Sequence, residues 1–345
     1  MSPEQITKFT QQYKQPAFRV QQAIEAFCVH GASSFQDITP WPKALREAAE
    51  KELQALSLKE EQVLRSGSKA AYKALLKLPD GNYVETVLLS PKPGLWSTCI
   101  SSQVGCGMGC TFCATGKLGF MRNLTAEEIC DQVLFWMQYM KKHNLDGRLN
   151  NIVYMGMGEP FANYAEVNKS LQILTNPKVF NFGDRHISVS TSGLVPGIIQ
   201  LAKQWPQVNL AISLHATNDT ERSEMMPINN TYNIKKLQNA LKKYFQYTNR
   251  KVFLEYILLK DKNDTPRHAK ELAEFVQAVE KPHLLHVNLI VYNKTASKFE
   301  ETPRERAQQF CNLLKRHGVH ATIRKNLGRD IAGACGQLAG TATTT

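Results

Sequence analysis

Three cysteines, Cys106, Cys110 and Cys113, lie within eight residues and have the spacing C-x3-C-x2-C. Thiolates are soft ligands that suit zinc and iron–sulfur clusters. A structural zinc site normally uses four protein ligands, and no fourth cysteine or histidine lies in this stretch. Three ligands would leave one iron of a [4Fe–4S] cluster open to an external chelating molecule. We therefore expect a cluster at these cysteines, with zinc as the alternative.

The sequence contains eight cysteines in all, and the others are scattered along the chain. A disulfide framework is a poor explanation for them because the sequence has no recognisable secretory signal. Cys335 lies in the glycine-rich stretch 333–336, which favours close approach of the backbone and a reactive, exposed thiol over a packed one. Cys99 lies on an apolar strand and by itself is typical of packing. We expect the other three to be buried small residues: Cys28, Cys130 and Cys311.

After about residue 95, strand-like runs are separated by stretches with helical periodicity. The strand-like runs are 96–101, 151–155, 186–191, 208–213, 252–257, 284–290 and 319–324. Strands that alternate with helices are typical of βαβ units and a parallel sheet. The clearest helix covers 124–140 and opens with a capping box, Thr125-Ala126-Glu127-Glu128. The sequence therefore predicts an α/β fold built as an open or partial (β/α)6-type barrel.

Polar and glycine-rich groups occur at the carboxyl ends of these predicted strands. Because the carboxyl ends of parallel strands share one face, we expect these groups to form a single site at the mouth of the barrel. In chain order they are Cys106–Cys113, Gly156–Glu159, Ser190–Gly193, Ser213–His215, Glu255 and Asn293.

The chain before residue 95 has a different pattern. Residues 1 to about 56 indicate a small helical unit, with Ser2 as an N-cap and Pro3 at the first helical position. Further helices are expected near 17–30 and 43–55. Short strands are expected near 71–78 and 83–89, on either side of the turn Pro79-Asp80-Gly81-Asn82.

We expect three parts along the chain. Residues 1–90 form an N-terminal helical and β accessory domain, and residues 91–330 form the core barrel. Residues 331–345 form a C-terminal segment that carries Cys335, with a frayed tail from Gly340.

The chain is basic, with 42 Lys and Arg against 30 Asp and Glu and a formal net charge of +12. Such an excess is typical of proteins with a polyanionic partner, although a merely basic enzyme is the alternative. No apolar run approaches the roughly 18 residues that span a bilayer, so we expect a cytoplasmic protein with no membrane contact. Basic side chains that could contact a nucleic acid are Lys117, Arg122, Arg250, Lys251, Arg324, Lys325 and Arg329.

The cysteine motif, with the aromatic Phe112 before its last cysteine, resembles the signature of the radical S-adenosylmethionine superfamily. In that superfamily the open iron is chelated by the amine and carboxylate of S-adenosylmethionine. Met155–Pro160 resembles the superfamily's second-strand element, which holds the methionine amine. The alternative for this glycine–acid pair alone is a loop after a buried strand.

Motifs along nearly the whole chain resemble those of the RlmN/Cfr family of radical enzymes, which methylate an adenine of 23S ribosomal RNA. The motifs are Val84–Val87, Cys99–Cys106, Met155–Pro160, Ser190–Gly193, Ser213–His215, Pro227–Asn229 and Ala334–Leu338. The resemblance implies that the accessory domain grips RNA and that the target adenine is flipped out of its stack to reach the site.

The resemblance also implies how the cysteines outside the cluster act. Carbons C2 and C8 of adenine are not nucleophilic, so Cys335 first takes a methyl group from one S-adenosylmethionine. A second S-adenosylmethionine supplies a radical that activates this methyl group, which adds to the ring and joins RNA to protein. Cys99 then assists proton removal and forms a disulfide with Cys335 that releases the product.

Other site residues are implied by the same resemblance. Glu85 matches a glutamate with an acid–base role. The positions that match S-adenosylmethionine contacts are Gly158, Glu159, Ser190, Ser213, Leu214, His215 and Asn293. An electron-donating reductase system is implied as a partner, and we expect a monomer.

Two branches of the family differ in the carbon that they methylate. Pro160 after the motif glutamate and the polar Ser192 favour the C2 branch, which also uses transfer RNA as a substrate. The Cfr branch, which methylates C8 and confers antibiotic resistance, is the alternative. An RNA-binding protein whose cysteines hold a structural metal without catalysis is an alternative of another class.

Overall fold

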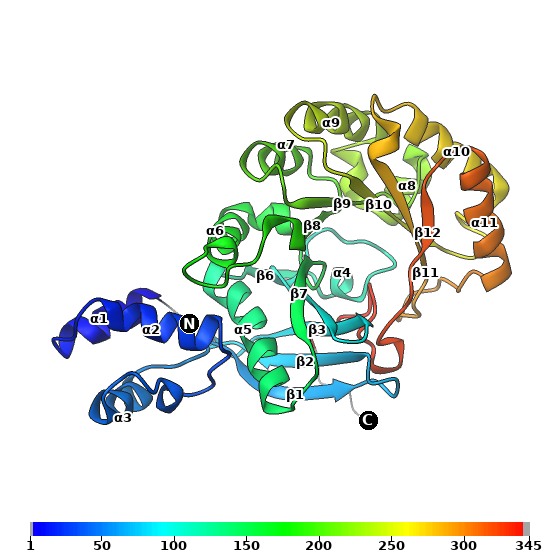
Figure 1. Ribbon diagram of the computed structural model, residues 1–345. Helices are drawn as coiled ribbons and strands as arrows, with labels where there is room; N and C mark the ends of the chain where they lie inside the picture. Colours follow the sequence, from blue (N-terminus) through cyan, green and yellow to red (C-terminus); the bar gives the residue numbers. More distant parts are fainter. Residues whose placement is uncertain (1–2, 341–345) are drawn as a thin grey trace.

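A ten-stranded sheet forms the centre of the computed structural model, which describes residues 3–340 (Figure 1). Its strand order is β1-β2-β3-β4-β7-β8-β9-β10-β11-β12. The strands are β1 (Lys59–Arg65), β2 (Ala71–Lys77), β3 (Tyr83–Lys92), β4 (Leu95–Cys99), β7 (Arg148–Tyr154), β8 (Ile187–Thr191), β9 (Asn209–Ser213), β10 (Val252–Leu258), β11 (Leu285–Val291) and β12 (Ala321–Ile323).

Within this sheet, β4, β7, β8, β9, β10, β11 and β12 pair in parallel, and helices connect them on the outer side of the curved sheet (Figure 1). The connecting helices are α5 (Ala126–Lys142), α6 (Tyr164–Thr175), α7 (Val195–Gln204), α8 (Asp219–Met225), α9 (Ile234–Tyr247), α10 (Pro266–Gln277) and α11 (Arg304–Arg316). Because β1 and β12 are the two edges of the sheet, the barrel stays open. The predicted α/β fold with a partial barrel is confirmed.

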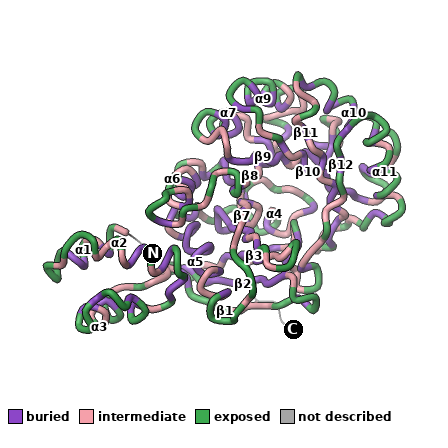
Figure 2. The backbone as a smooth tube through the Cα atoms, in the orientation of Figure 1, coloured by how far each residue is buried: buried purple, intermediate pink, exposed green. Residues whose placement is uncertain are grey.

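The buried faces explain why these segments form these elements. β10 has the sequence VFLEYIL and is buried along nearly its whole length, as a parallel strand covered by helices should be. Figure 2 shows the buried strands in the middle and the exposed residues on the outer sides of the helices. Helix α5 begins at the predicted capping box, in which Thr125 Oγ1 accepts from the N–H of Glu128 at 3.2 Å.

Strands β1, β2 and β3 extend the sheet in an antiparallel arrangement, and β3 pairs with β4. The sequence did not predict β1, because KEEQVLR is largely exposed and has little apolar alternation. The expected domain boundary at residue 90 lies inside β3, so the sheet is continuous across it. The division into domains stays a prediction.

The N-terminal helices have a hydrophobic core of their own. α1 (Pro3–Gln12), α2 (Phe18–Cys28) and α3 (Lys43–Glu52) pack around Phe27 and Trp41, which are almost fully buried. These helices lie beside α5, to which the core is joined through Leu134 (Figure 1). Helix α1 begins at Pro3 as predicted, and the proposed cap Ser2 lies outside the described residues. None of the helices within residues 3–340 has both the length and the apolar character needed to cross a bilayer.

Candidate active site

The cysteine-rich loop runs from the end of β5 (Gln103–Gly105) to the start of α4 (Ala114–Leu118). Its first turn requires Gly105, which has a φ of +72° and where a Cβ would lie 1.9 Å from the carbonyl oxygen of Gly119. The N–H of Cys106 donates to the same oxygen at 2.8 Å. The small sheet of β5 and β6 (Phe120–Asn123), which the sequence did not predict, therefore sets the start of the loop.

A cavity of about 160 Å³, the cluster cavity, is lined by the three cysteines and by residues at the ends of the parallel strands. Of the residues expected to contact S-adenosylmethionine, those that line it are Gly158, Glu159, Ser190, Ser213 and His215. The carboxyl ends of the strands therefore meet at one site, as expected from the sequence.

Leu214 and Asn293 are not among the lining residues of the cluster cavity. Leu214 is fully buried, and its N–H donates to the carbonyl oxygen of Glu255 at 3.0 Å. Asn293 Nδ2 donates to the carbonyl oxygen of Cys335 at 3.2 Å. In this structure Asn293 therefore contacts the C-terminal segment rather than the cluster cavity.

The three thiols fit an iron–sulfur cluster. Burial raises the pKa of Cys106 to about 11, and burial together with Cys113 and Cys106 raises the pKa of Cys110 well above its ordinary value. Thiols that oppose one another's ionisation become thiolates beside a positive centre, which a bound metal supplies. Three soft donors on the wall of a cavity that also has other polar groups match a [4Fe–4S] cluster that accepts an additional ligand.

Backbone N–H groups contact both carboxylate oxygens of Glu159. Its Oε2 accepts from the N–H of Ser192 at 2.6 Å, and its Oε1 accepts from the N–H of Phe161 at 3.1 Å. Burial raises the pKa of Glu159, and these hydrogen bonds oppose that rise. Gly158, at φ +99°, lets the chain pass Gln103, because a Cβ would lie 2.6 Å from that residue's own Cβ. The carboxylate therefore has one fixed orientation beside the cluster cavity.

His215 is held in one tautomer. Its Nδ1 accepts from the N–H of Ile257 at 3.0 Å, so Nε2 carries the proton. Burial, assisted by the nearby charge of Arg222, lowers the pKa of His215 to about 3. The ring packs edge-to-face on Phe112 of the cysteine loop, with centroids 4.9 Å apart. His215 is thus a neutral hydrogen-bond donor at physiological pH.

Arg222 holds the strand ends together, and the sequence analysis missed it. It is fully buried, and its guanidinium donates to four oxygens at 2.7–3.1 Å. These belong to the carbonyls of Ser192, Ser213 and Leu214 and to the side chain of Asn229. Burial lowers the pKa of Arg222 to about 10. Residue type alone does not distinguish such an arginine from an exposed one on a helix.

We expect Arg222→Met to lower the free energy of unfolding by about 3 kcal/mol or more, because buried carbonyl oxygens lose charged donors. Chemical denaturation followed by circular dichroism measures this change. The matched control is Arg267→Met on α10, which removes an exposed guanidinium from two ion pairs and should cost less than about 1 kcal/mol. Equal stability of the two variants would contradict the role of Arg222.

A second cavity, of about 350 Å³, adjoins the first and is lined by both Cys99 and Cys335. We call it the Cys99 cavity. Cys335 is exposed and lines both cavities, as does Arg324. Burial, with Cys335 as the next cause, raises the pKa of the Cys99 thiol to about 12. Both thiols are free, and the transient disulfide between them stays a prediction.

The remaining cysteines are where the sequence predicted them. Cys28, Cys130 and Cys311 are buried, with exposed fractions of 1%, 4% and 2%. Each lies in a helix of the N-terminal unit or of the barrel. Their expected role as small packing residues is confirmed.

Glu85 does not line either cavity. It lies on β3, is buried, and forms an ion pair with Lys73 of β2, with Nζ and Oε1 2.7 Å apart. Its Oε2 accepts hydrogen bonds from the backbone of Ala339 and Gly340. An acid–base role for Glu85 stays a prediction.

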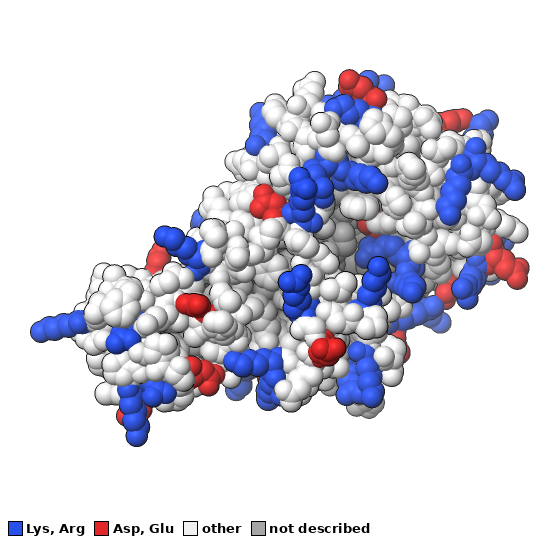
Figure 3. Space-filling model, viewed as in Figure 1, with Lys and Arg blue, Asp and Glu red and all other residues white. Residues whose placement is uncertain are grey.

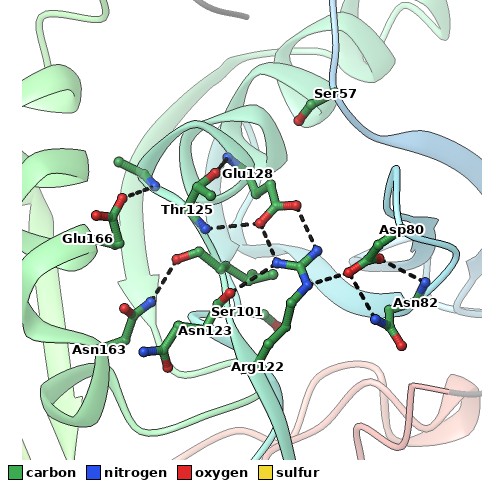
Figure 4. Close-up of polar contacts among 12 residues, drawn as sticks. Ser57, Asp80, Asn82, Ser101, Arg122, Asn123, Thr125, Glu128, Asn163 and Glu166 are labelled. Atoms are coloured by element: carbon green, nitrogen blue, oxygen red, sulfur yellow. Dashed lines mark hydrogen bonds and ion pairs between the residues drawn. The ribbon is translucent and has the colours of Figure 1, made fainter.

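Arg122, one of the candidates for contact with nucleic acid, forms ion pairs within the protein, and its contact with nucleic acid stays a prediction. Figure 4 shows its guanidinium between Glu128, 2.8 Å away, and Asp80. Glu128 also caps α5 by accepting from the N–H of Thr125 at 2.9 Å. Because its guanidinium forms ion pairs with two carboxylates, Arg122 anchors β6 to α5 and to the turn before β3.

Comparisons with known proteins agree with the cysteine motif. Residues 100–276 match the model of the Radical SAM superfamily. A "Ribosomal RNA large subunit methyltransferase Cfr" from Shouchella clausii is 40% identical over 98% of this chain and 95% of its own length. A "Probable dual-specificity RNA methyltransferase RlmN" from Chloroflexus aurantiacus is 42% identical over 97% of this chain and 90% of its own. The crystal structure of a radical SAM methyltransferase from Sphaerobacter thermophilus, 38% identical, superposes with a TM-score of 0.91 over 99% of this chain and 98% of that one.

Proposed function

Because the chain belongs to the RlmN/Cfr family of radical S-adenosylmethionine RNA methyltransferases, we propose that it methylates C2 of an adenine in 23S ribosomal RNA. The observation that supports this most is the position of Cys335, which lines both the cluster cavity and the Cys99 cavity. A thiol at this position can react with a methyl donor in the cluster cavity and with the thiol of Cys99 in the adjoining cavity.

In this proposal, Cys106, Cys110 and Cys113 hold a [4Fe–4S] cluster that, when bound, supplies the electron for reductive cleavage of S-adenosylmethionine. Glu159 and Ser213 line the same cavity and would bind the cofactor's polar groups. His215 would donate from Nε2, since its Nδ1 is already an acceptor. Leu214 and Asn293 do not line this cavity, so they would act on the cofactor site indirectly, by holding the loops in which they lie.

Cys335 would act as the methyl carrier. Its sulfur takes a methyl group from one S-adenosylmethionine, and a second is consumed to activate the methyl for addition to the ring carbon. The RNA is then joined to Cys335 by a thioether. Cys99, in the adjoining cavity, would assist proton removal. Its thiolate would then attack the sulfur of Cys335, so that the S–S bond forms as the bond from that sulfur to the product carbon breaks and the product carbon takes up a proton.

Two side chains beside the cavity favour C2 over C8. Pro160 follows Glu159, and the polar Ser192 donates its N–H to Glu159 Oε2. Both match the C2 branch, whereas relatives with either name are about equally similar overall. Methylation of C8 is the alternative outcome.

We propose that the RNA is held by the basic surface around the site. Figure 3 shows Lys and Arg side chains around a hollow on the face in view. Positive side chains around a hollow would neutralise RNA phosphates while a flipped adenine enters it. We also propose that transfer RNA is a second substrate, that a reductase supplies the electron and that the enzyme is a monomer.

The decisive experiment reconstitutes the protein anaerobically with iron and sulfide and supplies S-adenosylmethionine, a reductant and unmodified 23S ribosomal RNA or transfer RNA. Mass spectrometry of the nucleosides should find 2-methyladenosine. A variant with alanine at Cys106, Cys110 and Cys113 should bind no iron and give no methylated nucleoside. Detection of 8-methyladenosine would assign the chain to the other branch, and iron-free protein that never cleaves S-adenosylmethionine would refute the enzyme altogether.

A further inference from the structure

The C-terminal segment, residues 333–340, crosses the mouth of the barrel without forming a helix or strand. Hydrogen bonds from the cysteine-loop side hold its middle: the N–H of Ala114 donates to Gly336 O at 2.8 Å, and Thr115 Oγ1 donates to Leu338 O at 2.6 Å. Leu338 is buried in the main hydrophobic core. A short irregular segment that must present Cys335 accurately therefore depends on a few specific contacts.

Its far end is held by Glu85. Glu85 Oε2 accepts from the N–H of Ala339 at 2.6 Å and from the N–H of Gly340 at 3.0 Å. Two successive backbone donors thus converge on one carboxylate oxygen, four and five residues after Cys335. Such charge-assisted bonds are stronger and more directional than neutral ones.

The carboxylate itself is fixed from the opposite side. Lys73 Nζ lies 2.7 Å from Oε1, and the side chains of Lys73 and Glu85 are only 4% and 1% exposed. The carbonyl oxygen of Glu85 accepts from Ser101 Oγ at 2.6 Å, and its N–H donates to Met157 Sδ at 3.3 Å. Ser101 and Met157 belong to the segments that lead into the cysteine loop and the Glu159 loop.

Both oxygens of Glu85 are therefore used in structural contacts, and the residue lines neither cavity. We propose that Glu85 and Lys73 form a clamp that positions the C-terminal segment, and with it Cys335, between the two cavities. Glu85 is then a positioning residue instead of an acid or base. The consequence for Cys335 rests on its proposed role as methyl carrier.

Two double variants separate the acceptor oxygen from the buried charge. Lys73→Met with Glu85→Gln keeps an acceptor oxygen for Ala339 and Gly340, whereas Lys73→Met with Glu85→Leu removes it. Neither leaves an unpaired buried charge, which is what would prevent folding after a single replacement. Amide hydrogen exchange of the peptide that covers residues 333–340 reports the clamp directly, without any need for catalysis.

We expect the leucine variant to exchange at least about tenfold faster in this peptide than wild type, because two part-buried, charge-assisted hydrogen bonds are lost. The glutamine variant should stay within about threefold of wild type by the same reasoning. In reconstituted enzyme, S-methylation of Cys335, measured from the protein's mass, should fall with the leucine variant and be rescued by the glutamine variant.

Three outcomes would overturn the proposal: the first and third would refute the clamp, and the second would refute the exclusion of Glu85 from proton transfer. One is equal exchange in the two double variants. Another is a glutamine variant that keeps its amide protection and its methylated Cys335 but no longer methylates RNA, which would assign Glu85 to proton transfer. The third is equally accelerated exchange in the control Asp264→Ala, which removes another buried, ion-paired carboxylate. If wild-type enzyme methylates no RNA, the proposed function fails, but the exchange comparison still decides on the clamp.

Discussion

Replacement of Cys335 by alanine should abolish methylation of both the protein and the RNA. Cys335 is exposed, lines both cavities and lies in a segment held at its middle and its far end, which suits a carrier that must react with two partners. The loss should be at least about three orders of magnitude, as for removal of other covalent nucleophiles. Tritium from methyl-labelled S-adenosylmethionine, counted separately in protein and RNA, measures both losses.

The reductive cleavage of S-adenosylmethionine provides the internal control for this variant. Cys335→Ala should still release 5′-deoxyadenosine, because the cysteines that would hold the cluster are unchanged. The matched protein control is Cys311→Ala, which removes a buried thiol from α11 and should leave methylation of RNA near wild type. Labelled RNA from the Cys335 variant would show that the methyl group takes another route.

Replacement of Cys99 by alanine should instead trap the RNA on the protein. Cys99 is buried beside Cys335, and its raised pKa of about 12 keeps it a protonated thiol at neutral pH until a step of the reaction removes the proton. Without this thiol the thioether between Cys335 and RNA has no resolving partner. Denaturing gels of labelled RNA should show a protein-linked species in near-stoichiometric amount.

Nuclease digestion followed by peptide mass spectrometry should locate the trapped adenine on Cys335. The double variant Cys99→Ala with Cys335→Ala should give no linked RNA, which excludes linkage through another residue. Free methylated RNA released by Cys99→Ala at the wild-type rate would remove Cys99 from the proposed reaction.

Several features of this protein follow from the sequence by itself. The C-x3-C-x2-C spacing and the alternation of apolar strands with helices are local patterns, so they could be recognised without coordinates. The capping box at Thr125 is also a local pattern. The burial of Cys28, Cys130 and Cys311 could be predicted from residue type alone. Because parallel strands place their carboxyl ends on one face, the meeting of the polar strand ends could be predicted too.

Other features depend on contacts between segments far apart in the chain, which no local pattern encodes. The sequence paired Cys99 with Cys335 only through its resemblance to a family, whereas the tertiary structure places both on one cavity. Only the tertiary structure brings the N–H groups of Ala339 and Gly340 to Glu85. It also buries Arg222 among four acceptor oxygens, a role that residue type alone does not reveal. The partners of a buried charge are chosen by packing, because a charge must find a partner wherever the fold desolvates it. The sequence therefore determined the chemistry of the cysteine loop, and the tertiary structure decided which distant side chains hold the second half of the site in place.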